Sequence, residues 1–107
     1  MPQYDVYVNP NPNPRSLESV PYVVDVQSSL LSVLRTRLAM PLSRIGIDAP
    51  GLPRRLAPQF VVAGERLALH PHAAAGIDAR LLRDPVASLA ACAGEIRDAL
   101  DAVVSGV

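Results

Sequence analysis

Two histidines, an aspartate and an arginine form the group of residues in this sequence that is best suited to chemistry. His70 and His72 flank a proline, and Asp78 and Arg80 follow shortly after them. Histidine and carboxylate side chains can act as general acid and general base, and arginine can bind a phosphate group. If folding gathers these four side chains, they could form the metal-free active site of a ribonuclease.

A metal-dependent or cysteine-dependent reaction has less support. A zinc site needs three or four protein ligands, whereas His70 and His72 have only the remote Cys92 to add. Cys92 lies among alanines in a helical pattern, where we expect a small buried core residue and not a reactive thiol. The sequence contains no nucleophile elbow, glycine-rich phosphate loop, HExxH or CxxC motif. We therefore expect no metal and no cofactor, and we interpret both histidines as loop residues at the end of a strand.

The charge balance argues against a protein that binds nucleic acid directly. Arginines alone supply the 10 basic residues, and 10 acidic residues balance them to a formal net charge of zero. Proteins that neutralise a phosphate backbone are normally basic. We therefore expect a protein that acts by binding another protein and not an enzyme.

Length and composition predict one small domain, residues 1–107, that associates with itself. Half of the 107 residues are apolar, but only 4% are aromatic. A chain of this length forms one modest core, and excess apolar surface on a small domain is commonly covered in an oligomer. We expect a homodimer.

The sequence also favours a cytoplasmic protein that makes no contact with a membrane. It has neither an apolar run as long as a membrane span nor a cleavable leader. Its single cysteine cannot form an internal disulfide, which fits a reducing compartment.

The stretch from Pro21 to Leu42 predicts the nucleus of an antiparallel sheet. Apolar and other residues alternate from Tyr22 to Gln27 and again from Arg37 to Leu42, which is typical of half-buried strands. A connection rich in serine and leucine, Ser28 to Arg35, joins the two strands. Its Leu30-Leu31 pair would be exposed unless another surface covers it.

The segment before this nucleus predicts one further strand and a long loop. Tyr4 to Val8 alternate as a strand does. The prolines of Asn9 to Pro14 remove donors and restrict the backbone, and Arg15 to Ser19 complete the loop.

The segment after the nucleus predicts a loop followed by a hairpin. Ser43 to Pro58 is rich in proline and glycine, and its Arg54-Arg55 pair reads as a solvated basic spot. Gln59 to His70 resembles a hairpin in which Gly64 and Glu65 are the central residues of a type II′ turn.

A change of period near the end of the chain predicts a terminal helix. Ile77 to Arg83 could form one helical turn, and Val86 to Leu89 reads as extended. Apolar residues then recur at helical spacing from about Ala90 to Val104. Ser88 is the expected N-cap, and Gly106 is the expected stop signal.

Several segments in the same order resemble one known family. VVDVQSSLL followed by RLAMPL resembles the VDVQS…PL signature of the CcdB family, the toxin halves of bacterial toxin–antitoxin pairs. YDVYVNPN, QFVVAGERLAL and PVASL…EIRDALDAVVSGV extend the resemblance over nearly the whole chain.

The resemblance implies a mainly β fold, a five-stranded SH3-like antiparallel sheet with a C-terminal helix, and a two-fold homodimer formed through the sheet and chain ends. Family members bind the A subunit of DNA gyrase and trap it on cleaved DNA, without catalysis by the toxin. A cognate antitoxin with a disordered C-terminal segment wraps the toxin and removes it from gyrase.

The resemblance also implies which residues contact gyrase. The last three residues of the family, Trp-Gly-Ile in the best-known pattern, correspond here to Ser105, Gly106 and Val107. Ser105 departs from the pattern, because a serine lacks the large stacking face of tryptophan.

For the antitoxin, the implied contacts are Leu30 and Leu31 and the polar Asp101 on the terminal helix. Packing of the leucine pair on the chain's own core is an equally good interpretation.

Two functions remain open for this chain. The first is a gyrase poison, or a relative with weakened toxicity. The second is a ribonuclease toxin of the MazF and Kid type on the same fold.

Overall fold

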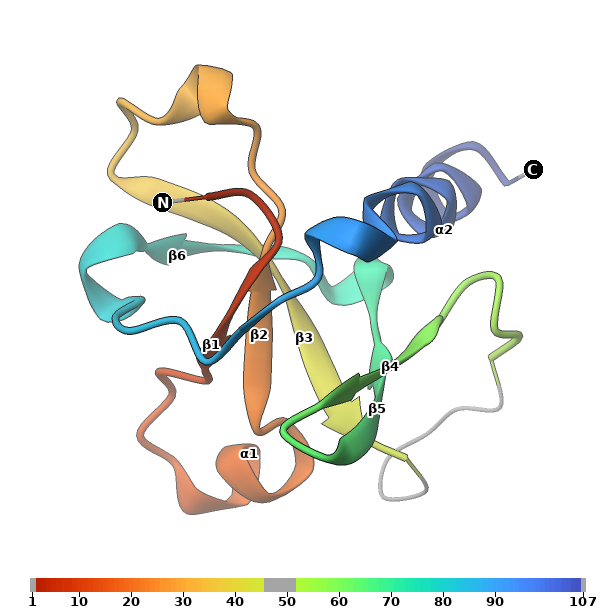
Figure 1. Cartoon of the computed structure of the whole chain (residues 1–107), viewed down its shortest axis with the longest axis horizontal. Helices are drawn as coiled ribbons and strands as arrows, with labels where there is room; N and C mark the ends of the chain where they lie inside the picture. The colour runs from red at the N-terminus through yellow and green to blue at the C-terminus, as the bar shows by residue number, and fades with distance from the viewer. Residues whose placement is uncertain (1, 46–51, 107) are drawn as a thin grey trace.

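The chain folds into a strongly curled antiparallel sheet that nearly closes into a barrel, with one long helix packed beside it (Figure 1). The computed structural model describes residues 2–45 and 52–106. The strands are β1 (Asp5–Val8), β2 (Tyr22–Asp25), β3 (Thr36–Arg44), β4 (Gln59–Val62), β5 (Glu65–Leu69), β6 (Ala75–Asp78) and β7 (Ala87–Ser88). The helices are α1 (Pro14–Ser19) and α2 (Ala93–Ser105), with single 3₁₀ turns η1 (Ser29–Leu31), η2 (Pro71–Ala73), η3 (Ala79–Leu81) and η4 (Ala90–Cys92). The predicted fold class, mainly β with a C-terminal helix, is confirmed.

The sheet has more strands than predicted. Its order is β4-β5-β3-β2-β1-β7, with β6 also paired to β3, so the described residues form seven strands and not five. β7 has two residues, which is too short for an alternating pattern. β6 has four residues, but its sequence AGID does not alternate between apolar and polar residues. The helical turn predicted for Ile77 to Arg83 is confined to η3, because Ile77 and Asp78 belong to β6.

β3 is the strand on which the rest of the sheet is assembled. Along one edge its residues from Ala39 to Leu42 pair with β2, as the sequence predicts. Along the other edge Thr36 to Ala39 pair with β6, and Leu42 to Arg44 pair with β5. Pro41 lacks an N–H but lies in the gap between these two pairings, where the missing donor interrupts no ladder on that edge.

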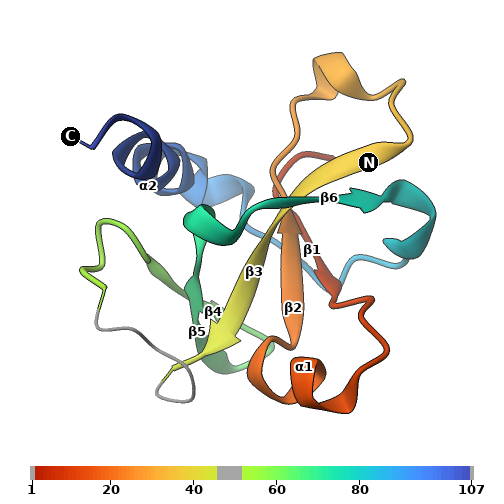
Figure 2. The ribbon, with the colours of Figure 1, turned by 180° about the vertical axis from the view of Figure 1, so that it is seen from behind.

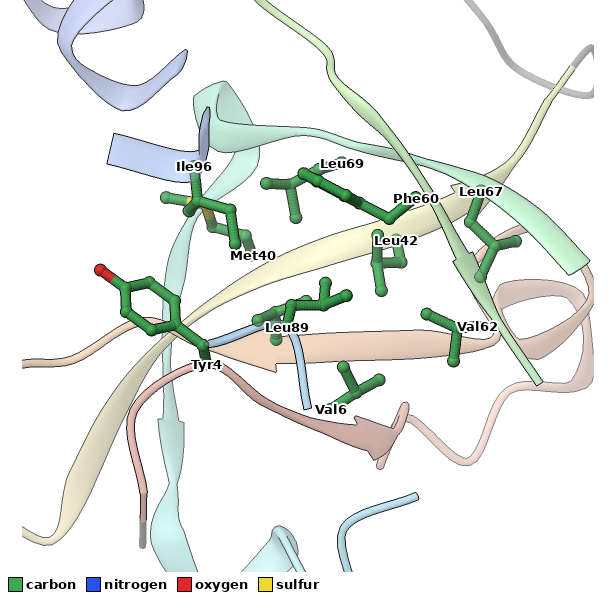
Figure 3. Close-up of a cluster of buried hydrophobic side chains, with 11 residues drawn as sticks. Tyr4, Val6, Met40, Leu42, Phe60, Val62, Leu67, Leu69, Leu89 and Ile96 are labelled. Atoms are coloured by element: carbon green, nitrogen blue, oxygen red, sulfur yellow. The ribbon is translucent and has the colours of Figure 1, made fainter. Parts of the chain in front are cut away.

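The alternation of β2 places side chains in two separate clusters. Val24 joins the larger cluster, which fills the inside of the curled sheet together with Ile96 of α2 (Figure 3). Val23 joins a smaller cluster on the other face with Tyr7, Ala39 and Leu82. Burial on both faces explains why β2 is apolar with few interruptions.

Arg15 to Ser19, which we predicted as loop, form most of α1. Pro14 occupies the first turn, where a helix needs no proline N–H. The Asn13 side chain accepts a hydrogen bond from the Arg15 N–H at 3.0 Å and so caps the helix. The proline-rich segment therefore starts a helix instead of preventing one.

The β4–β5 hairpin forms as predicted, but its turn lies one residue earlier. Val62 pairs with Glu65, which leaves Ala63 and Gly64 as the central residues. Their φ angles are 51° and 80°, and positive φ at both positions is the requirement of a type I′ turn. The alternation of β4 and β5 sets this register. The predicted type II′ turn, with Gly64 at its first central position, is therefore wrong.

α2 ends where the sequence predicts, but it begins later. Ser105 is the last helical residue, and Gly106 follows with a φ of 72° in the left-handed region. The helix begins at Ala93, with Cys92 as an N-cap that makes no side-chain bond. Ser88, the expected N-cap, lies before η4 and does not cap α2, and its hydroxyl accepts a hydrogen bond from the Ala90 N–H at 3.2 Å.

A buried polar network joins β2 to β3 where the two strands leave the barrel. Arg37 Nε donates to Asp25 Oδ2 at 2.8 Å, and the two side chains are 2% and 0% exposed. Asp25 Oδ1 accepts from the Gln27 N–H at 3.0 Å. Arg37 Nη2 also donates to the Gln27 carbonyl at 3.3 Å. The network fixes the exit of β2 toward the loop of residues 28–35.

We expect Arg37→Met to lower the free energy of unfolding by about 3 kcal/mol or more, because it leaves the Asp25 carboxylate buried and unpaired. Adding Asp25→Asn in the same chain should restore part of this loss. The asparagine keeps an oxygen for the Gln27 N–H but carries no charge. Urea unfolding at neutral pH measures both effects.

Arg66→Met is the matched control, because Arg66 lies exposed on β5. Its effect should stay within about 0.5 kcal/mol. A double variant less stable than Arg37→Met alone would show that the charge of Asp25 is not what the arginine neutralises.

Candidate functional site

The C-terminal end of α2 presents a small exposed tip. The Ser105 hydroxyl donates to the Asp101 carbonyl at 2.6 Å, which turns this side chain back onto the helix. The Gly106 N–H donates to the Ala102 carbonyl at 3.0 Å. Val104 is 77% exposed and supplies apolar surface at the tip. Val107, the third predicted gyrase contact, lies outside the described residues.

A hollow of about 540 Å³ lies beside this tip. Asp98, Asp101, Val104 and Ser105 of α2 line one side, and Arg55 lines the other. Asp101, predicted to contact the antitoxin, therefore lies in the same hollow as Ser105, predicted to contact gyrase. Arg55 was interpreted as part of a solvated loop face, and its place opposite two carboxylates could be found only from the tertiary structure.

An apolar hollow of about 270 Å³ continues from the first around the end of the helix. It is lined by Pro53, Leu56, Ala102 and Gly106, and it shares Arg55 with the first hollow. The turn of residues 53–57 is closed by N–H groups of Leu56 and Ala57 that donate to the Pro53 carbonyl. The tip thus combines apolar and charged surfaces, which suits the binding of a polypeptide.

The predicted Leu30-Leu31 contact lies on a loop that is fixed at its base. Gln27 Nε2 donates to the Leu31 carbonyl at 3.1 Å, and Gln27 Oε1 accepts from the Leu38 N–H at 2.9 Å. The Ser28 hydroxyl accepts from the Leu30 N–H at 3.2 Å and caps η1. One glutamine side chain therefore connects the middle of the loop, at Leu31, to β3, at Leu38.

The side chains of this loop point into solvent. Leu30 is 89% exposed and Leu31 is 47% exposed. The interpretation that the pair packs on its own core is therefore wrong. Val33 and Leu34, which we did not single out from the sequence, are also 89% and 48% exposed. The sequence could have indicated them, because they are apolar residues in a connection between two predicted strands.

The loop and the tip of α2 lie far apart within one chain. Figure 1 shows them toward opposite ends of the long axis, and the reverse view in Figure 2 agrees. The predicted antitoxin contacts therefore do not form a single site, since Leu30 and Leu31 are on the loop and Asp101 is on the helix.

The two histidines form a separate group at the end of β5, as predicted. Their rings meet edge to face with centroids 5.3 Å apart, in a hollow of about 210 Å³ that Pro41 and Ser43 also line. His70 Nδ1 is buried and has no hydrogen-bond partner among the residues that the structure describes. Burial, and then the neighbouring His72, lower the pKa of His70.

Asp78 and Arg80 belong to a different hollow, of about 410 Å³, with Arg35. Arg80 Nη2 lies 2.7 Å from Asp78 Oδ2, and hydrogen bonds from Arg80 hold the pKa of Asp78 at about 2. The four residues proposed for a ribonuclease site are therefore divided between two hollows at the two ends of β6. Asp78 is also ionised at neutral pH and cannot serve there as a general acid.

No group of three or more histidine, cysteine, aspartate or glutamate side chains that could hold a metal ion occurs in residues 2–45 and 52–106. Cys92, predicted as a buried core residue, is half-buried and packs against the larger cluster. Among the helices of the described residues, none is long and apolar enough to cross a membrane.

The chain was compared with models of known protein families. The model of a family described as CcdB protein matches residues 3–106. The chain belongs to the CcdB family. No curated protein matches it. The CcdB match covers nearly the whole chain and makes this protein a toxin of the CcdB type, in agreement with the barrel and terminal helix.

The histidine pair predicts how the stability of this CcdB protein depends on pH. Because the pKa of His70 is lowered in the folded chain, the unfolded chain binds a proton more readily. The free energy of unfolding should therefore fall as the pH drops below about 6.5, the ordinary pKa of histidine. Urea unfolding of His70→Gln should show a shallower decline.

His72→Gln is the matched control. It removes only the secondary cause of the lowered pKa, so it should flatten the decline less than His70→Gln does. Equal slopes for the wild type and His70→Gln would rule out His70 as the origin.

Proposed function

We propose that this CcdB-family toxin binds the A subunit of DNA gyrase in the cytoplasm and traps the enzyme on cleaved DNA. The family match over residues 3–106 is the observation that carries this proposal. We assign the contact to the tip formed by Ser105, Gly106 and Val107. In support, Ser105 and Gly106 are exposed at the end of α2.

The tip acts by shape and apolar surface and not by catalysis. Gly106 adopts a φ of 72°, a conformation that is costly for other residues, and it ends the helix there. The Ser105 hydroxyl is already bonded to the Asp101 carbonyl, so it has little to offer a partner. Val104 is the large apolar side chain available to compensate for the missing tryptophan.

We further propose that the toxin is a homodimer and that a cognate antitoxin binds at Leu30, Leu31 and Asp101. These contacts are far apart in one chain (Figure 1). An extended antitoxin segment could reach both, either along one protomer or across the two-fold axis of the dimer. Such a segment would order on binding, as disordered partner segments commonly do.

Ser105→Trp should increase gyrase-dependent cleavage of supercoiled plasmid. A tryptophan buried at an interface commonly contributes at least about 2 kcal/mol, or roughly thirtyfold in affinity. Removing Gly106 and Val107 should abolish cleavage while sedimentation equilibrium still shows a dimer. Ala91→Trp, at an exposed position before α2, is the matched control and should change nothing.

If the shortened chain still promotes cleavage as well as the intact chain, the tip is not the gyrase contact. Cleavage of RNA without gyrase in the same preparations would favour the ribonuclease toxin instead. A monomer at micromolar concentration would contradict the proposed dimer.

Leu31→Asp should weaken binding of the antitoxin encoded beside this toxin, because a charge in an apolar contact must be desolvated. The variant should remain folded, with a free energy of unfolding within about 0.5 kcal/mol of the wild type. Copurification measures binding. Val61→Asp is the matched control, because Val61 is 56% exposed on β4, away from the loop. Equal capture of both variants would exclude Leu31 from the interface.

A further inference from the structure

The histidine pair at the end of β5 is a part of the molecule that the proposed function does not use. His70 and His72 stand on either side of the buried Pro71. The His70 N–H donates to the Pro41 carbonyl of β3 at 3.0 Å, and the His70 carbonyl accepts from the Ala73 N–H at 3.0 Å. The two imidazoles therefore extend from a short backbone segment that is held both by β3 and by the η2 turn.

The spacing of the two rings suits a shared metal ion. The centroids of the His70 and His72 rings lie 5.3 Å apart, and the ring planes meet at 86°. Zinc–nitrogen bonds to histidine are about 2.1 Å long, so two imidazoles on one tetrahedral ion have their centroids roughly 5 Å apart. The rings would have to turn about their side-chain torsions to direct one nitrogen each at the ion. The backbone already holds them at the required separation.

One ring nitrogen of the pair has no partner. His70 Nδ1 is buried, and it forms no hydrogen bond within residues 2–45 and 52–106. A buried polar atom without a partner is unusual in a folded protein. Burial, and then the neighbouring His72, lower the pKa of His70, so its imidazole is neutral at neutral pH and keeps a lone pair for a metal. A water molecule is the alternative partner, and a metal titration distinguishes the two.

The hollow around the pair favours one class of ion. It measures about 210 Å³, which is room for an ion and several water molecules. Its described lining includes Ser43 but no aspartate or glutamate. Magnesium and calcium prefer carboxylate oxygens, whereas zinc, nickel and copper bind imidazole well. The described lining also contains no arginine, so a phosphate or carboxylate is a poorer occupant than a metal ion.

Two protein ligands are too few for a structural zinc site, as expected from the sequence. They suffice for an ion that keeps water in its other positions. We infer that His70 and His72 form an exchangeable site for one divalent transition-metal ion that favours imidazole, with Zn²⁺, Ni²⁺ and Cu²⁺ as the candidates. The remaining positions are open to water or to a donor group of another molecule.

The site is independent of the proposed gyrase and antitoxin contacts, because it uses none of their residues. η2, which carries His72, packs against α2. A bound ion would therefore lie next to the turn that supports the terminal helix.

Isothermal titration calorimetry tests the site on the full-length protein, prepared without a polyhistidine tag and freed of metal by dialysis against EDTA. Zn²⁺ should bind with micromolar affinity and a ratio of one ion per chain. Cu²⁺ should bind more tightly than Zn²⁺, in the usual order for nitrogen ligands, and Mg²⁺ should not bind. Binding of Mg²⁺ as tight as that of Zn²⁺, or a ratio of one ion to two chains, would contradict a site built from the imidazoles of one chain.

His70→Gln and His72→Gln locate the site. Each should weaken Zn²⁺ binding at least about tenfold, and the double variant should not bind Zn²⁺. His72 is exposed, so His72→Gln should keep the urea midpoint of the wild type even if His70→Gln lowers it. Cys92→Ser is the matched control, because it removes the single thiol of the chain, and it should leave binding unchanged.

Two results with these variants would overturn the inference. Equal Zn²⁺ affinity of the wild type and the double variant would indicate an adventitious ion only. Loss of binding in Cys92→Ser would assign the ion to the thiol.

A second measurement identifies the ligands. Pulsed electron paramagnetic resonance of the Cu²⁺ form should detect two histidine imidazoles in the wild type and one in His72→Gln. Zn²⁺ should also raise the urea midpoint of the wild type and not that of the double variant, because an ion that binds the folded chain stabilises it. Unchanged imidazole signals in His72→Gln, or a midpoint that Zn²⁺ lowers, would show that the folded histidine pair is not the site.

Discussion

The buried ion pair between Asp25 and Arg37 is the interaction that holds the end of β2 and the base of the loop of residues 28–35. It joins β2 to β3 where the two strands diverge, and both side chains are almost completely buried. Such a pair is tolerated only when further hydrogen bonds satisfy the remaining polar atoms, and Gln27 supplies them through its backbone. The Gln27 side chain then holds the loop of residues 28–35 through Leu31 and Leu38. The VDVQS segment, which carries part of the resemblance to the CcdB family, is thus the base of this loop.

The side chains best suited to chemistry do not lie together in the folded chain. Asp78 and Arg80 form an ion pair with each other. His70 and His72 lie in a different hollow, away from that pair. The surfaces that remain are an apolar loop at one end of the chain and the tip of α2 at the other (Figure 1).

The zero net charge conceals an uneven distribution of charge. Along the exposed side of α2, acidic residues outnumber the single Arg97: Glu95, Asp98 and Asp101. Beside the loop of residues 28–35, the hollow of Arg35 and Arg80 contains two arginines and one acidic residue, Asp78. Partners that distinguish the two ends can therefore do so by charge as well as by shape, since complementary charge contributes to specificity. Composition alone would have concealed this difference.

The sequence by itself determined the features that depend on local pattern. The alternation from Tyr22 to Leu42 predicted the central strand pair, and helical spacing with Gly106 predicted the end of α2. The tertiary structure decided what depends on distant partners. β6 exists because it pairs with β3, the hairpin turn follows the pairing of Val62 with Glu65, and Arg35 meets η3 through a contact between residues 35 and 79. The family resemblance predicted that Leu30 contacts a partner, but only the tertiary structure shows that its side chain is exposed. A local sequence pattern cannot predict this exposure, because it depends on which distant residues pack against the loop.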